Sequence, residues 1–298
     1  MNTATTAWPG ASVIEPAIER PTAMRLAQTE YQRVTDVVDA LRPEDWTRPT
    51  DCTAWDVRQL VAHIAGHAKL LSSPFELARQ LRAAKARQQP GQASIDALTA
   101  LQVEERQHLG PEELRAELRR VGPRAAKARR RIPGFVRRRR LPDPEVVNGL
   151  PETWSIGYAS DVIFTRDSWM HRLDLARATG RDPVLTVDHD GVIVADIVAE
   201  WARRHGQPYR LELTGPAGGS WSSGTGGEAI AMDAADFCRI VSAAPAPTAA
   251  NPGGCSPPKS RFERESAPRR LSRESDPWPC ATYVGHNPAA VSGTHTRR

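Results

Sequence analysis

Residues 158–179 run without a proline or a glycine, although the 298-residue chain contains 25 prolines and 21 glycines. Within this run, apolar side chains recur at steps of three and four residues, which is the spacing of one face of an α-helix. They are Val162, Ile163, Trp169, Met170, Leu173 and Ala176. Gly180 follows at a position where a glycine commonly ends a helix. The pattern predicts one long helix from about residue 157 to residue 178.

This helix carries an acid and a histidine four residues apart. Asp167 and His171 stand at positions i and i+4, so their Cβ atoms are expected about 6 Å apart on one helical face. A carboxylate and an imidazole placed in this way can reach the same divalent metal. A catalytic zinc normally needs three protein ligands and one open position. The third ligand has to come from another part of the chain.

Helical patterns also cover residues 21–41, 55–85, 94–109 and 111–131. Long helices separated by loops favour an up-and-down four-helix bundle, which we place at residues 21–180. His63 lies beside the apolar face of the second pattern and is the best candidate for the third ligand. His67 follows one turn later and offers a rival His63/His67 pair, although the polar run after Gly66 favours a solvent-facing His67.

The residues alone leave the alternatives to a metal site open. The residues alone favour His63 as a buried histidine with one hydrogen bond to a backbone carbonyl. Asp167 can instead form a weak surface ion pair with Arg166 or Arg172.

A different pattern begins after Pro183. A helical stretch at residues 188–205 is followed by short alternating stretches at 209–214, 220–223 and 228–232 and by a last helix at 232–241. Residues 184–243 are therefore expected to form a small α+β domain. Residues 1–20 and 244–298 are rich in proline and polar residues, so both ends are predicted to be disordered. The fold class is mainly α: a helix bundle, a small α+β domain and a tail.

Two motifs in this order resemble those of a known family. The segment TAWDVRQLVAHIAG, Thr53–Gly66, is similar to the first motif of the mycothiol-dependent maleylpyruvate isomerase family, within the DinB-like metal-binding superfamily. The segment RDSWMHRLD, Arg166–Asp174, is similar to its second motif. The segments LELTG, Leu211–Gly215, and ADFCR, Ala235–Arg239, also resemble the family. The resemblance covers roughly residues 22–242.

The resemblance implies a DinB-like four-helix bundle with a divalent metal, usually zinc, held by His63, Asp167 and His171. The acid is often glutamate in the family, and aspartate reaches one methylene less far. Iron, nickel or cobalt suit the same ligands. The implied activity is isomerisation or S-transfer with mycothiol or a similar low-molecular-weight thiol, whose metal-activated thiolate attacks a small electrophilic substrate. Asp174 is a candidate acceptor behind His171, with a solvated acid near Arg177 or Arg181 as the alternative.

The C-terminus departs from the family pattern. A C-terminal arginine is implicated in the family's function, and Arg239 is the last arginine before the proline-rich tail. We take Arg239 as the candidate catalytic arginine. The tail after residue 243 is similar to a frameshifted or unrelated extension.

Twelve basic residues against the single acid Glu117 lie between Arg115 and Arg140. We expect a solvated helix face and a mobile loop there, with binding of an anionic substrate, lipid headgroup or nucleic acid as the alternative. A catalytically silent metal-binding bundle, acting in stress response or binding, is the second functional hypothesis. A nucleic-acid-associated protein is the third. The absence of a signal peptide and of a membrane span predicts a cytoplasmic protein.

Overall fold

The computed structural model describes residues 13–52, 54–142, 144–147 and 150–242. The predicted disordered tail at 244–298 and residues 1–12 lie outside this range. Ile14, which belongs to the N-terminal stretch predicted to be disordered, forms backbone hydrogen bonds with the segment that precedes α7 (Ile156–Tyr158). Its N–H donates to Thr153 O at 2.8 Å, and its carbonyl accepts from Ser155 N at 3.1 Å. Within the described residues, no helix is long and apolar enough to cross a membrane.

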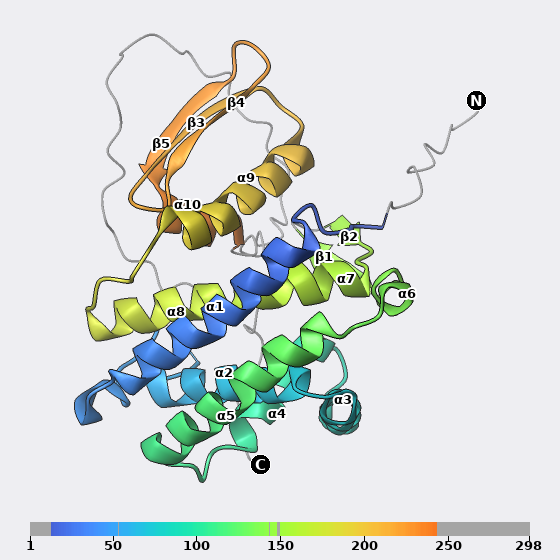
Figure 1. Cartoon of the computed structure of the whole chain (residues 1–298), viewed down its shortest axis with the longest axis vertical. Coiled ribbons are helices and arrows are strands. Elements are labelled where there is room, and N and C mark those ends of the chain that lie inside the picture. The colour runs from blue at the N-terminus through green and yellow to red at the C-terminus, as the bar shows by residue number, and fades with distance from the viewer. Residues whose placement is uncertain (1–12, 53, 143, 148–149, 243–298) are drawn as a thin grey trace, which may run out of the picture.

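Four helices form the bundle that the sequence predicted (Figure 1). They are α1 (Arg20–Asp39), α2 (Val57–Leu71), α5 (Pro111–Arg130) and α8 (Phe164–Thr179). α1 and α2 each pack against both α5 and α8. Their shared core is formed by buried aliphatic side chains from all four helices, including Val34, Val38, Val57, Leu60, Val61, Leu114, Leu118 and Leu175.

The single helix predicted at residues 55–85 is two helices. α2 ends at Leu71, and α3 (Pro74–Arg87) begins after Ser73. Ser73 Oγ accepts from Glu76 N at 3.2 Å and caps α3, while Pro74 occupies a first-turn position that needs no backbone N–H. The prediction overlooked this start signal because the apolar spacing continues across it.

Shorter elements connect the bundle helices. α4 (Ser94–Glu104) packs against α2 and α3. The stretch after α5 contains a short helix and two antiparallel strands, and a further helical turn lies at the predicted start of the long helix. These are α6 (Gly134–Arg137), β1 (Glu145–Val147), β2 (Leu150–Glu152) and α7 (Ile156–Tyr158). A separate 3-10 turn, Pro43–Asp45, lies between α1 and α2. A π-helical segment, Ala159–Ile163, joins α7 to α8, and Gly180 ends α8 with φ 66°.

The C-terminal part has the predicted α+β composition. A π-helical turn, Val187–Gly191, leads into α9 (Val192–His205). Three strands and a final helix follow: β3 (Tyr209–Thr214), β4 (Gly219–Ser223), β5 (Glu228–Asp233) and α10 (Ala234–Ser242). β3 is the central strand, antiparallel to β4 and parallel to β5. Every second residue of β3 is buried, as its alternating sequence predicts.

α8 belongs to both parts of the molecule, and Figure 1 shows it between the C-terminal helices α9 and α10 on one side and the bundle helices α2 and α5 on the other. Trp169, Met170 and Leu173 pack into the apolar cluster of α9 and the sheet. Leu175 faces the bundle core. Because both sides are covered, the polar residues of α8 from Thr165 to Asp174 are buried as well, and each needs a partner inside the protein.

The arginine-rich stretch is partly structural. Arg129 is buried and donates to Ser160 O at 2.7 Å and to Thr165 Oγ1 at 2.6 Å. Arg137 forms an ion pair with the buried Asp161. The predicted solvated face therefore does not extend to these two arginines, which fasten α5 and α6 to the segment preceding α8.

Candidate metal centre

α2 and α8 bring the three predicted ligands together. α2 begins at a capping box in which Gln59 N donates to Asp56 Oδ1 at 2.8 Å and Asp56 N donates to Gln59 Oε1 at 2.9 Å. This start places His63 opposite α8. Potential ligand atoms of His63, Asp167 and His171 all lie within 4.8 Å of one another. The predicted spacing of Asp167 and His171 on one helical face is present.

The free ring nitrogens point at the same carboxylate. His63 Nε2 lies 3.9 Å from Asp167 Oδ2, and His171 Nε2 lies 3.5 Å from Asp167 Oδ1. Both Nε2 atoms are buried and lack a hydrogen-bond partner among the described residues. Ligands about 2.1 Å from a tetrahedral metal lie roughly 3.4 Å apart. The donors thus fit a cation, and its presence would account for two otherwise orphaned polar atoms.

The opposite nitrogen of each imidazole has an acceptor. His63 Nδ1 lies 2.9 Å from Gln102 Oε1 on α4, and His171 Nδ1 lies 3.2 Å from Asp174 Oδ2. Such contacts orient metal-binding histidines and set the tautomer that leaves Nε2 free. Asp174 is buried, so it is not the solvated acid that the sequence left as an alternative.

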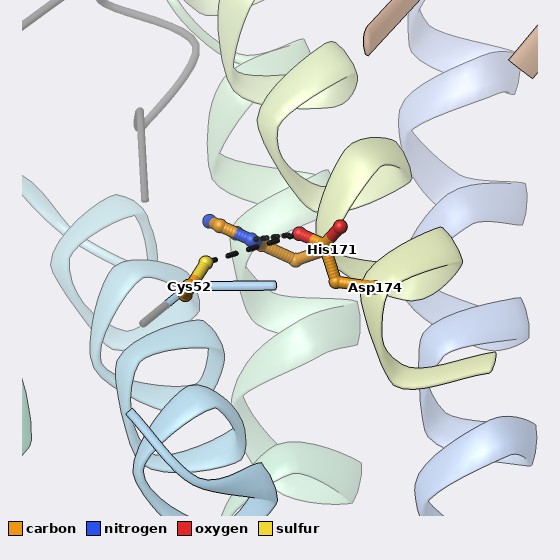
Figure 2. A group of neighbouring side chains, drawn as sticks. All are labelled: Cys52, His171 and Asp174. Atoms are coloured by element: carbon orange, nitrogen blue, oxygen red, sulfur yellow. Dashed lines mark hydrogen bonds and ion pairs between the residues drawn. The ribbon is translucent and has the colours of Figure 1, made fainter. Parts of the chain in front are cut away.

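Asp174 also contacts two residues outside α8. In Figure 2, dashed lines join its carboxylate to His171 and to Cys52, whose Sγ lies 4.0 Å from Asp174 Oδ2. Cys52, His171 and Asp174 form a second group with mutually close ligand atoms. Arg239 Nη2 lies 2.8 Å from Asp174 Oδ1. Because Arg239 already balances the charge of Asp174, we favour the group that contains His63.

Arg239, the candidate catalytic arginine, reaches the site from α10. Its Nη1 donates to Asp51 Oδ2 at 2.9 Å, and its Nη2 pairs with Asp174. The side chain retains 15% exposure. The C-terminal α+β region therefore contributes a cationic group beside the bundle residues.

His67 is buried, contrary to the expected solvent-facing position. Its ring is parallel to that of His63 with centroids 6.1 Å apart, and its Nδ1 lies 3.1 Å from Asp167 Oδ2. It contacts the candidate ligand Asp167 and belongs to neither group of close ligand atoms found among the described residues.

Burial and charge determine the protonation of these groups. Burial, followed by the nearby His171, lowers the pKa of His63 to about 3, so its imidazole is neutral. Burial opposes a charged His171, but Asp167 and Asp174 outweigh it and raise the pKa of His171 to about 10. Burial likewise opposes a charged Asp167, yet His171 and His67 hold its pKa well below the usual range. A cation entering this site must displace the proton on His171.

Sequence reasoning missed Gln102 and Phe164, whereas it expected Trp55 as a core or pocket-wall residue. The Trp55 ring lies 5.1 Å from that of His63, and the Phe164 ring lies 5.0 Å from that of His67. No spacing rule singles out a glutamine on another helix, whereas Trp55 and Phe164 belong to the two segments that carry the candidate ligands.

Residues 27–176 match the family model described as the mycothiol maleylpyruvate isomerase N-terminal domain. The chain belongs to the mycothiol maleylpyruvate isomerase family. The match runs from α1 into α8 and contains the three candidate ligands, and it confirms the resemblance and the enzyme class inferred from the two motifs.

Two solved structures are also similar. Both are crystal structures of the mycothiol-dependent maleylpyruvate isomerase, one of a histidine-to-alanine mutant. The mutant has 16% identity and a TM-score of 0.49, covering 76% of this chain and 89% of the other. The second has 16% identity and a TM-score of 0.48, covering 81% and 97%. No curated protein sequence matches the chain.

Proposed function

We propose that the protein is a metal-dependent isomerase that uses mycothiol or a similar low-molecular-weight thiol to isomerise a small electrophilic substrate. Maleylpyruvate, named in the family description, is the first substrate to test. The observation that carries the proposal is the convergence of two buried, unpartnered Nε2 atoms on the carboxylate of Asp167.

Each residue has a distinct part in this proposal. His63, Asp167 and His171 would hold the metal, and two imidazoles with one carboxylate are a ligand set that suits catalytic zinc. A divalent cation at this site would stabilise a thiolate at neutral pH. Asp174 holds the ring of His171 from behind. Arg239 is held by two carboxylates, and its partly exposed guanidinium would donate hydrogen bonds to an anionic group of the substrate.

The adduct between thiol and substrate has two possible fates. The thiolate forms a carbon–sulfur bond with the electrophilic carbon of a carbon–carbon double bond, and the π electron pair of that double bond moves to the conjugated carbonyl oxygen as an enolate. The enolate returns the pair when the thiol leaves or takes up a proton when it stays. In an isomerase the carbon–sulfur bond breaks again after rotation about the neighbouring carbon–carbon bond, and the thiol is regenerated. In an S-transferase the bond remains and the thiol is consumed. The family match favours the isomerase.

Metal content tests the proposal first. Elemental analysis of the purified full-length protein is expected to find about one divalent metal per chain, the number that one site with three ligands binds. The metal is expected to be absent from His171→Ala and retained in His108→Ala, which changes an exposed histidine. A folded wild-type protein that stays metal-free after incubation with zinc would refute the proposal.

Measurements of turnover on the wild type and on an Arg239 variant distinguish an active enzyme from a silent metal-binding bundle. Arg239→Met is expected to retain its metal but to lower thiol-dependent turnover of maleylpyruvate about 10- to 100-fold, the usual effect of losing a hydrogen bond to a charged group. Arg210→Met, on an exposed position of β3, is the control. Unchanged turnover in Arg239→Met would exclude the role of Arg239. A metal-loaded wild type without turnover would instead identify a silent bundle.

A further inference from the structure

Two buried glutamine side chains connect His63 to the backbone of its own helix. His63 Nδ1 lies 2.9 Å from Gln102 Oε1. Gln102 Nε2 donates to Gln80 Oε1 at 3.2 Å, and Gln80 Nε2 donates to Gly66 O at 3.3 Å. Gln80 and Gln102 are 0% and 1% exposed. The chain runs from α2 through α4 and α3 and returns to α2.

The last member of this chain gives it a direction. A backbone carbonyl only accepts hydrogen bonds, so Gln80 must turn its NH₂ group to Gly66. Its oxygen then faces Gln102, which must donate to it. The oxygen of Gln102 therefore faces His63, whose Nδ1 must carry the hydrogen. Turning both amides around would leave two buried oxygens facing each other at Gly66 without a proton between them, which is unfavourable.

We propose that Gln80 and Gln102 are positioning residues that set the tautomer of His63, with hydrogen on Nδ1 and the lone pair on Nε2. The consequence for function rests on the proposed metal site, because a nitrogen that binds a metal must be free of hydrogen. His63 Nε2 faces Asp167 and has no partner among the described residues. The opposite tautomer would direct an N–H at the cation.

Close packing keeps the chain in place. A Cβ atom added at Gly66 would lie 2.6 Å from Gln102 Cβ and 2.9 Å from Arg106 Nη1, so glycine is required for this approach of α4 to α2. Arg106 donates to Gln102 O at 3.0 Å and is held by the carboxylate of Glu117 at 2.9 Å. Gln102 therefore has little freedom to move away from His63.

The tautomer is measured directly by NMR of full-length, metal-free protein with ¹⁵N-labelled histidine. The His63 signals are assigned by comparison with His63→Asn. Wild type is expected to show a protonated Nδ1 and an unprotonated Nε2. In Gln102→Met the hydrogen is expected to move to Nε2, because Asp167 is then the nearest acceptor. In Gln80→Met both tautomers are expected, since nothing then fixes the amide of Gln102.

Metal affinity provides a second readout. Both variants are expected to bind zinc about 10- to 100-fold more weakly, as is typical when the partner of a metal-binding histidine is lost. Gln107→Met, an exposed glutamine after α4, should match wild type in both measurements. If Gln102→Met does not fold, Gln80→Met carries the test, because Gln80 does not contact His63 in this chain of hydrogen bonds.

The outcomes separate this inference from the proposed function. A protonated Nε2 in wild type, or a tautomer unchanged in both folded variants, would overturn the role of the two glutamines even if the protein binds zinc. The expected change of tautomer in a protein that binds no metal would support the role of the glutamines and refute the metal site.

Discussion

Replacing Arg172 with leucine is expected to lower the free energy of unfolding by about 3–5 kcal/mol, the usual cost of leaving buried charges without their partner. Arg172 is 1% exposed. Its Nε donates to Glu30 Oε1 at 2.7 Å, and its Nη2 donates to Asp190 Oδ1 at 2.6 Å. The substitution leaves both carboxylates buried, although His189 still contacts Glu30 and Arg33 still contacts Asp190.

Urea unfolding followed by circular dichroism measures this effect. Arg119→Leu is the control, because its ion pair with Asp39 is largely exposed and such pairs contribute about 1 kcal/mol or less. Adding Glu30→Gln to Arg172→Leu is expected to recover part of the loss by removing one unpaired charge. A change below about 1 kcal/mol in Arg172→Leu would mean that water reaches these carboxylates in solution.

The burial of Arg172 could not be predicted from the sequence. Periodicity located α8 and its apolar side chains, and Gly180 located its end. Periodicity does not reveal that a second layer covers the other side of the helix. The sequence therefore offered Arg166 and Arg172 as exposed partners of Asp167, whereas Arg166 pairs with Asp196 and Glu200 inside the protein.

The candidate site likewise contains some residues that the sequence predicts and others that it does not. Asp167 and His171 were predictable because a fixed helical spacing relates them, and His63 because its motif and its apolar face single it out. Asp174 was predictable for the same reason, because it lies three residues after His171 on the same helix. Gln102 was not predictable, because its place beside His63 depends on the packing of α4 against α2, which Gly66 permits. Contacts between helices carry no such short-range signature.

Replacing Asp167 with asparagine is expected to weaken zinc binding more than about 100-fold, since losing even an outer partner costs about 10- to 100-fold. Two effects oppose each other. The lost carboxylate no longer attracts the metal, but it also no longer holds the proton that the metal must displace from His171. A carboxylate attracts a divalent cation about twice as strongly as a single proton at equal distance. The net result is weaker binding.

Competition with a chromogenic chelator measures the zinc affinity of three variants, each of which lacks one carboxylate. Asp167→Asn is expected to have the largest effect, Asp174→Asn an intermediate one, and Asp236→Asn, whose side chain is 60% exposed, none. Wild-type affinity should rise with pH up to about 10, where His171 loses its proton, because below that pH the metal competes with the proton. In Asp167→Asn the rise should end at a lower pH, since the largest influence raising the pKa of His171 is gone. Equal affinities of Asp167→Asn and Asp236→Asn would remove Asp167 from the site, because a ligand and an exposed acid cannot have the same effect on a buried cation.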